Sequence, residues 1–287
     1  VLYYRRYIRD FARMATPHQL IMANVAVGRA YIHEEKPDDA KDMFDAAVRI
    51  WNGGAAQSIA RMTNISQGEQ IRMLRESADA TSEALFYLAE RKYRAFEAIR
   101  FPRYSGGRNM QRVQQWSQTE FRRWVEQKMA ALRAAEADYA KIAQVRVPIE
   151  NGVILQSAAW QVAAASRVGV MYRQFVDSFR EAPVPEEIEN DYELYNVYVG
   201  ALEEQSEPLL RQATEAFLFC LRTATNVRWF NEYSRQCEQE LNRLNPREYP
   251  IAAELRGPAT NAFETPGTPG VASLGRPAGE EDEGDQQ

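Results

Sequence analysis

Apolar side chains recur along most of this chain at spacings of three and four residues, which is the period of an amphipathic α-helix. One early stripe joins Tyr4, Ile8, Phe11 and Met14. Runs that alternate apolar and polar residues are nearly absent, and no Asn-Gly turn joins two such runs. The pattern predicts an all-α fold.

Prolines and capping residues divide this pattern into predicted helices. Thr16 is placed to cap a helix that has Pro17 in its first turn. Pro102, Pro148 and Pro208 end three further helical patterns. Besides a helix pair between residues 17 and 52, the predicted helices span 1–14, 67–101, 109–145, 153–180, 192–207 and 227–244, the last capped by Asn226.

The segment 24–52 contains small and aromatic residues at informative spacings. Counted from Ile21 as position one, positions 8, 11, 20, 24 and 27 are held by Gly28, Tyr31, Ala40, Phe44 and Ala47. Pro37 ends one helix of this unit, and Asp38 or Asp39 can cap the next. The segment resembles a tetratricopeptide repeat (TPR), a helix-turn-helix unit of about 34 residues. Small residues then allow the two helices to cross closely, and the larger ones fill the interface.

A TPR unit cannot bury its apolar face alone, so the resemblance implies stacked neighbours. Near the other end, Ala213, Phe217 and Cys220 repeat the spacing of Ala40, Phe44 and Ala47. Between these units, Ala89 stands where the repeat glycine often lies, and the predicted helices are longer than a standard unit. We therefore expect a TPR-like α-solenoid of antiparallel helix pairs with longer, irregular middle helices. The expected divisions are 1–54 with the clear unit, 55–147 with long helices, 148–256 with the degenerate unit, and the tail 257–287.

Composition is ordinary for a soluble protein with a core: 45% of the 287 residues are hydrophobic and 26% are charged. The net charge is −5, and the segment from Gly257 onward carries six acids and one base, so residues 1–256 are formally neutral. A neutral body argues against nucleic-acid binding, and no apolar run is long enough for a transmembrane segment. The Pro- and Gly-rich acidic tail is predicted to be disordered.

The sequence lacks the motifs of common catalytic and metal sites. Its two histidines, His18 and His33, do not form a metal-binding pair on one helix face, and Cys220 and Cys237 lack zinc-site spacing. No phosphate-binding loop or nucleophile elbow occurs. Carboxylate pairs such as Glu203-Glu204 are typical of solvated helix faces. We therefore expect no enzyme activity, no catalytic residues, no metal site and no cofactor.

The two cysteines lie 17 residues apart on predicted helices. Two buried free thiols are the expected state, since cysteine packs as a small apolar residue. A disulfide between adjacent helices is the alternative, which needs geometry that the sequence does not supply. The chain opens with Val1 and without a signal-like apolar stretch, so we interpret it as a segment of a longer protein.

Stacked helix pairs form a concave surface that is lined by the first helix of each unit. In the clear repeat, the groove positions are Met22, Val25, Arg29, Ile32 and His33. In TPR domains that clamp a chaperone's C-terminal carboxylate, such positions hold lysine and asparagine; here Val25 replaces the expected cation. An apolar groove with Arg29 and His33 as polar groups would suit an extended or helical peptide from another protein. The alternative is that a neighbouring helix covers these residues.

A second resemblance lies near the end of the folded region. The strings Arg228–Ser234, Cys237-Glu238 and Leu244–Pro250 are similar to the C-terminal part of TPR proteins from deltaproteobacteria, and the similarity extends upstream to about residue 80. Some of these proteins belong to the envelope-spanning machinery of adventurous gliding motility. The resemblance implies a periplasmic or cell-envelope scaffold and carries no residue-level function.

We therefore expect a non-enzymatic scaffold that binds other proteins within a bacterial cell-envelope assembly. A cytoplasmic TPR adaptor or co-chaperone is the alternative within the same class. From another class, the alternative is a helical enzyme or ligand-binding solenoid with a cleft between the long helices. The partner, the number of repeats and the oligomeric state stay open at this point.

Overall fold

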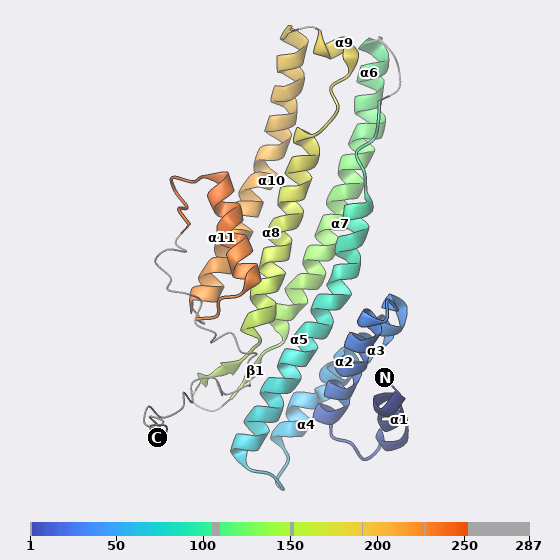
Figure 1. The fold of residues 1–287 in the computed structure, drawn as a ribbon, viewed down its shortest axis with the longest axis vertical. Helices are drawn as coiled ribbons and strands as arrows, with labels where there is room; N and C mark the ends of the chain where they lie inside the picture. The colour runs from blue at the N-terminus through green and yellow to red at the C-terminus, as the bar shows by residue number, and fades with distance from the viewer. Residues whose placement is uncertain (1, 105–109, 150–151, 191, 227, 252–287) are drawn as a thin grey trace, which may run out of the picture.

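The computed structural model describes residues 2–104, 110–149, 152–190, 192–226 and 228–251 (Figure 1). In chain order the elements are α1 (Leu2–Phe11), α2 (Pro17–His33), α3 (Pro37–Ile50), the π-turn η1 (Trp51–Ala55), α4 (Ala56–Ala60), α5 (Gln67–Ala98), α6 (Met110–Trp116), the π-turn η2 (Ser117–Phe121), α7 (Arg122–Ala140), the 3₁₀ turn η3 (Lys141–Gln144), β1 (Val147–Pro148), β2 (Ile154–Leu155), α8 (Ala158–Arg180), α9 (Glu186–Glu189), α10 (Tyr192–Asn226) and α11 (Glu232–Leu244).

The prediction of an all-α chain is confirmed, because helices make up most of the described residues. Within that part of the chain the only strands are β1 and β2, which pair antiparallel with Val147 opposite Leu155. Gly152 lies between them with a φ of +74°, a conformation that glycine adopts readily. The predicted disordered tail, 257–287, lies outside the described residues. The division at residues 54, 147 and 256 stays a prediction.

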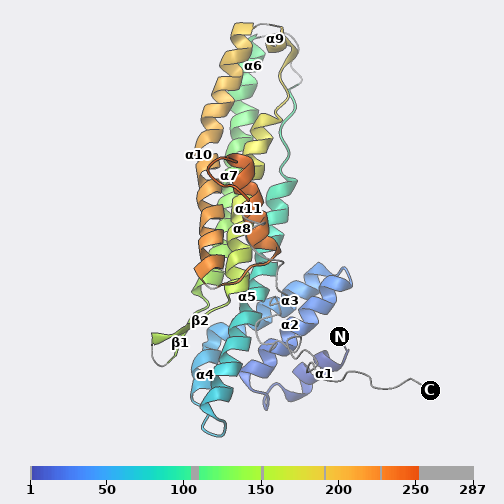
Figure 2. The same cartoon turned by 60° about the vertical axis from the view of Figure 1, so that its left-hand side comes forward.

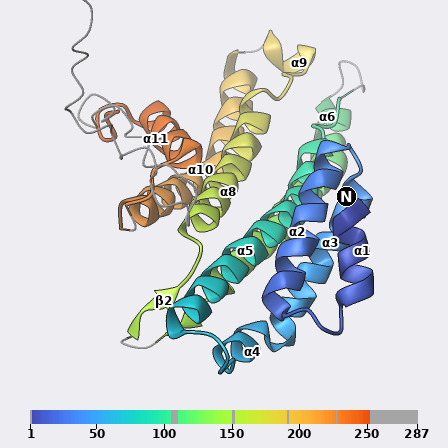
Figure 3. The same cartoon turned by 60° about the horizontal axis from the view of Figure 1, so that its bottom comes forward.

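The helices pack as successive hairpins. Helices α2 and α3 pair with each other and both pack on α5; α5 and α7 then pair, and both contact α8. Helices α8 and α10 form the next pair, and both contact α11. Figure 2 shows the long helices side by side, and Figure 3 shows α1–α3 on one side of α5 with α8, α10 and α11 on the other. Each pair therefore supplies the surface on which the following helix packs.

One close contact recurs in the first and last of these hairpins. In α2, a Cβ added to Gly28 would lie 2.5 Å from the Phe44 ring of α3; in α8, a Cβ added to Gly169 would lie 2.5 Å from the Phe217 ring of α10. Both phenylalanines are fully buried. The missing side chain is thus what lets each helix pair approach this closely. The other packing residues predicted for these hairpins are also buried, namely Tyr31, Ala40, Ala47, Ala213 and Cys220.

Aromatic side chains of the long helices α5, α7 and α8 and of the residue Phe101 form a cluster. Phe101, which follows α5, packs its ring 4.8 Å from that of Trp124 in α7. Trp124 also meets Phe175 and Phe179 of α8 edge-on. Such rings bury large areas and favour edge-to-face contacts. The cluster therefore holds α5, α7 and α8 together near the C-terminal ends of α5 and α8.

Several helix ends differ from the sequence expectation. The predicted stop before Pro208 is wrong, since α10 continues through it to Asn226. A proline removes one helix hydrogen bond, but Pro208 is exposed, so water can replace it, and the apolar stripe of α10 against α8 continues unbroken. Helix α8 starts at Ala158, after β2 and the cap Ser157, rather than at 153. The cap of α11 is Asn231, not Asn226.

The N-terminal cap of α2 is confirmed. Thr16 accepts a hydrogen bond from the backbone N–H of Gln19, and the Gln19 side chain accepts one from the Thr16 backbone N–H, with Pro17 at the first helical position. This reciprocal capping box satisfies two backbone donors that the helix leaves unpaired. The capping threonine and the proline that follows it were therefore sufficient to predict where α2 begins.

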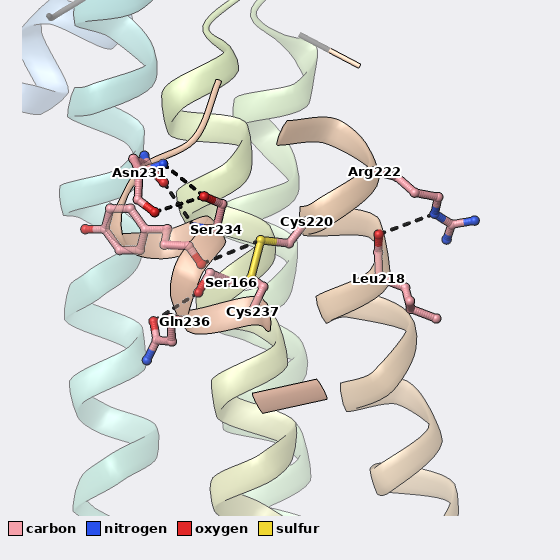
Figure 4. The surroundings of a disulfide bond; sticks show 9 residues. Ser166, Leu218, Cys220, Arg222, Asn231, Ser234, Gln236 and Cys237 are labelled. Carbon is pink, nitrogen blue, oxygen red and sulfur yellow. Dashed lines mark hydrogen bonds between the residues drawn. A yellow bond between two sulfur atoms is a disulfide. The ribbon is translucent and has the colours of Figure 1, made fainter. Parts of the chain in front are cut away.

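The two cysteines form a disulfide between α10 and α11 (Figure 4), which corrects the expectation of free thiols. Cys220 and Cys237 are both fully buried, and their Cα atoms are 6.5 Å apart. Helix α11 is also held to α8 by a 3.0 Å hydrogen bond from the Ser166 hydroxyl to Gln236. The last helix is therefore fixed to both members of the preceding hairpin.

The Gly–Phe contacts give a direct stability prediction. Gly28→Ala or Gly169→Ala forces a methyl group into a phenylalanine ring, so each should lower the free energy of unfolding by about 1–3 kcal/mol. Gly68→Ala in α5 is the matched control, since nothing lies within 4 Å of its added Cβ and helical Gly→Ala stabilises by roughly 0.5–1 kcal/mol. Urea denaturation followed by circular dichroism measures all three; equal stability of the Gly28 and Gly68 variants would contradict the contact.

Candidate protein-interaction surfaces

The predicted groove residues of α2 have unequal exposure. Met22 and His33 are exposed, and Ile32 is partly buried. Val25 is only 2% exposed and belongs to the core cluster that also contains Ile21. The placement of Val25 on an open groove is therefore wrong, because its side chain packs inside the hairpin core. The predicted role of the other groove residues in binding stays a prediction.

Arg29 is exposed but already has a partner within the fold. Its guanidinium donates two hydrogen bonds to the Glu83 carboxylate of α5, from Nε and from Nη2. Glu83 is 3% exposed. Such a bidentate ion pair fixes both the position and the orientation of the two side chains. Arg29 therefore ties α2 to α5, and its availability to another protein is limited.

The neighbouring carboxylate of α5 holds the start of α8. The Ser157 hydroxyl donates to Asp79, and the same oxygen accepts the backbone N–H of Trp160 as the cap of α8. Burial raises the pKa of Asp79, and the nearby charge of Glu83 acts in the same direction. The partly buried Asp79 and the buried Glu83 thus connect three helices.

A second polar centre surrounds Glu90 of α5. Its carboxylate accepts a 2.6 Å hydrogen bond from the hydroxyl of Tyr139 in α7 and a 2.7 Å bond from Nε of Arg167 in α8. The Arg167 guanidinium also lies 5.0 Å from the centroid of the Tyr93 ring, and burial raises the pKa of Tyr139. The two partners of this carboxylate come from different helices, so the centre sets how α5, α7 and α8 pack.

Lys128 of α7 is an unusual buried cation. It stands four residues before Leu132 and seven before Ala135, the spacing that Ala40 has in α3. Its Nζ donates a 3.0 Å hydrogen bond to the carbonyl of Ile99 at the C-terminus of α5 and lies 4.4 Å from the Phe96 ring centroid. Burial lowers the pKa of Lys128. A lysine at this place stabilises the C-terminal end of a helix.

Lys128 also lines a cavity of about 560 Å³ between the ends of α5 and α8. The cavity is lined by three cations and three carboxylates, and two of the carboxylates accept hydrogen bonds. Glu97 accepts a hydrogen bond from Gln174, and Asp177 from Arg173. Because its charges are balanced and partly satisfied, this cavity does not select a ligand of one sign.

A more apolar groove of about 300 Å³ lies between α7, α8 and α10. Its lining includes the small residues Ala140, Ala143, Ala164, Ala165 and Ala216, together with Phe219. Phe219 is 53% exposed. The groove therefore has one large apolar side chain open to solvent beside these alanines.

No group of histidine, cysteine and carboxylate side chains in the described part of the chain could hold a metal ion. None of its helices is long and apolar enough to span a membrane. The carboxylates of Glu83, which is buried, and Asp79, which is partly buried, have partners that account for their positions, and neither lines the cavities described above.

Comparisons with protein-family models, with curated proteins and with solved structures find no match.

Sequence reasoning missed three features that the structure brings together. Gly169 and Tyr172 have the same spacing as Gly28 and Tyr31, a signal that could have been read beside Phe217. Lys128 was not recognised as part of the repeat pattern because it is charged, whereas the equivalent position in α3 holds the small residue Ala40. The groove around Phe219 combines three helices that are distant in sequence, so no local pattern marks it.

The Arg29–Glu83 pair can be tested against an exposed pair. Arg29→Ala leaves the buried Glu83 carboxylate without its cation and should lower the free energy of unfolding by about 1–3 kcal/mol, less than for a fully buried pair because water reaches Arg29. Combining it with Glu83→Gln should recover most of this loss.

Arg211→Ala, which breaks the exposed pair with Glu207 in α10, is the control and should change stability by less than about 0.5 kcal/mol. Chemical denaturation measures all the variants. If Arg29→Ala and Arg211→Ala cost the same, Arg29 does not hold α2 to α5.

Proposed function

We propose that this chain is a TPR-like α-solenoid that serves as a non-enzymatic protein-interaction scaffold in a bacterial cell-envelope assembly. The observation that carries the proposal is the recurrence of one hairpin contact, Gly28 with Phe44 and Gly169 with Phe217. A contact that recurs at equivalent positions of two hairpins is what a repeat architecture requires. The hairpin between them has Ala89 and Leu132, both buried, in the corresponding places.

The order of helix contacts supports the same proposal. Each hairpin packs on the first helix of the next, and α11 covers the last one as a terminal helix would in a repeat protein. Helices that stack in one row leave grooves between neighbours. Rigid grooves of this kind bind helices or extended peptides of other proteins, which makes binding the function that this arrangement serves best.

The disulfide supports an envelope location outside the cytoplasm. Disulfides between buried cysteines persist in oxidising compartments such as the bacterial periplasm and are rare in cytosolic proteins. Cys220 and Cys237 form such a bond. The role in gliding motility rests on the sequence resemblance alone, whereas the compartment has this independent support.

The scaffold role can be tested by photo-crosslinking in cells of the native organism. A benzophenone amino acid placed at Met22 or at His33, both exposed on α2, should each give the same discrete crosslinked partner. Gln239, exposed on α11, is the matched control and should not give that product. Arg29 is unsuitable as a probe because it holds Glu83. Identical patterns at all three positions would argue against a partner on α2.

The compartment can be tested through the thiols. Protein from native cells, quenched in acid and alkylated without reductant, should carry no label on Cys220 or Cys237, because the bond is formed. The same chain produced in a reducing host cytoplasm and alkylated after denaturation is the control and should be labelled at both. Full labelling of the protein from native cells would overturn the envelope proposal.

A further inference from the structure

The groove between α7, α8 and α10 has a rim of one charge sign. The charged residues that line it are Glu136 and Glu215, and no lysine or arginine of the described residues does. Glu136 accepts a hydrogen bond from the Tyr172 hydroxyl, which leaves part of its carboxylate open, and Glu215 is exposed. An apolar groove with an acidic rim selects a segment that presents apolar side chains next to cations.

The same groove offers hydrogen-bonding groups to a bound segment. The side chains of Gln161 in α8 and Gln212 in α10 line it, and neither has a hydrogen-bond partner among the described residues. Tyr139 and Ile142 lie at the bottom of the groove, and alanines line much of the rest, so a docked helix or strand could approach closely. The groove is therefore complementary in shape, charge and hydrogen bonding to an amphipathic basic segment.

Helix α1 has the composition that such a groove selects. Leu2, Tyr3 and Met14, at or beside its ends, are 77%, 85% and 82% exposed, and none of the helix's residues is buried. Residues 2–14 carry four arginines and one acid. The helix thus presents exposed apolar and cationic side chains together.

The α1 helix of the same molecule already has a place in the fold. It packs on α2, where Ile8 meets the first core cluster and Arg5 donates a 2.9 Å hydrogen bond to the hydroxyl of Tyr31. Figure 3 shows α1 on the far side of α5 from α8 and α10. A segment that fills the groove must therefore come from another molecule.

We propose that the groove between α7, α8 and α10 binds α1 of a second copy of this chain. The exposed apolar side chains of α1 cover Phe219 and the alanines of the groove, and its arginines face Glu136 and Glu215. The tail of the chain is a poor occupant, since residues 257–287 carry six acids and one base and the rim would repel them. This association goes beyond the proposed scaffold role.

The two surfaces of this contact are different, so the association is heterologous. One molecule contributes its α1 and receives the α1 of the next, which leads to open chains rather than a closed two-fold dimer. This difference makes the contact testable with two variants, each of which destroys one side.

The experiment uses sedimentation velocity over a range of protein concentrations. Wild-type protein should form species that grow beyond the dimer. Phe219→Glu, which removes the groove surface, and the double variant Leu2→Glu/Tyr3→Glu, which removes the helix surface, should each associate at least about tenfold more weakly. Circular dichroism verifies that both variants remain folded. Gln57→Glu, exposed in α4 and outside both surfaces, is the control and should behave as wild type.

Mixing the two variants is the decisive step. In a 1:1 mixture, the intact α1 of one variant can still meet the intact groove of the other, so the mixture should form heterodimers and stop there. Wild-type protein that stays monomeric at every concentration would overturn the proposal, even if an unrelated basic amphipathic peptide bound the groove. A mixture that fails to dimerise, or variants that associate like wild type, would also overturn it.

Discussion

The structure depends on helices that approach so closely that only glycine fits at the crossing. At Gly28 and again at Gly169, the ring of a phenylalanine from the partner helix occupies the space where a side chain would begin. This contact sets the separation and the angle of each hairpin, and the buried residues around it follow from that geometry. The same internal contact therefore occurs in the α2–α3 hairpin and in the α8–α10 hairpin.

The middle hairpin, formed by α5 and α7, lacks the glycine–phenylalanine contact. Ala89 takes the glycine position and Lys128 takes that of a small residue. The lysine is accommodated because its ammonium reaches the carbonyl of Ile99 and the Phe96 ring. Here the packing is organised instead by polar centres on α5, with Glu83 held by Arg29 and Glu90 by Tyr139 and Arg167. Apolar crossings at the ends and polar connections in the middle together make one continuous row.

The sequence predicted the parts of this fold that depend on local physics. The cap at Thr16 and the small and aromatic positions from Gly28 to Ala47 involve residues close together in the chain, so their spacing carries the information. The partners Gly169 and Phe217 are 48 residues apart, whereas Gly28 and Phe44 are 16 apart, and the longer connection hid the equivalence. The helix end predicted before Pro208 was wrong because packing along α10 outweighs one lost hydrogen bond. The exposure of Val25 was predicted wrongly because it depends on how the neighbouring helices pack. The disulfide and the groove at Phe219 also depend on the packing of helices, so the local sequence did not reveal them.

The proposed repeat depends on two glycine–phenylalanine crossings, and nuclear magnetic resonance can observe them directly. In protein with labelled glycine and phenylalanine, one α-proton of Gly28 and one of Gly169 should have a chemical shift displaced by the ring current of the adjacent phenylalanine and show nuclear Overhauser effects to Phe44 and Phe217. Exposed glycines such as Gly68 and Gly200 should show neither effect. Ordinary shifts at Gly28 and Gly169, with no contacts to the phenylalanine rings, would contradict the account.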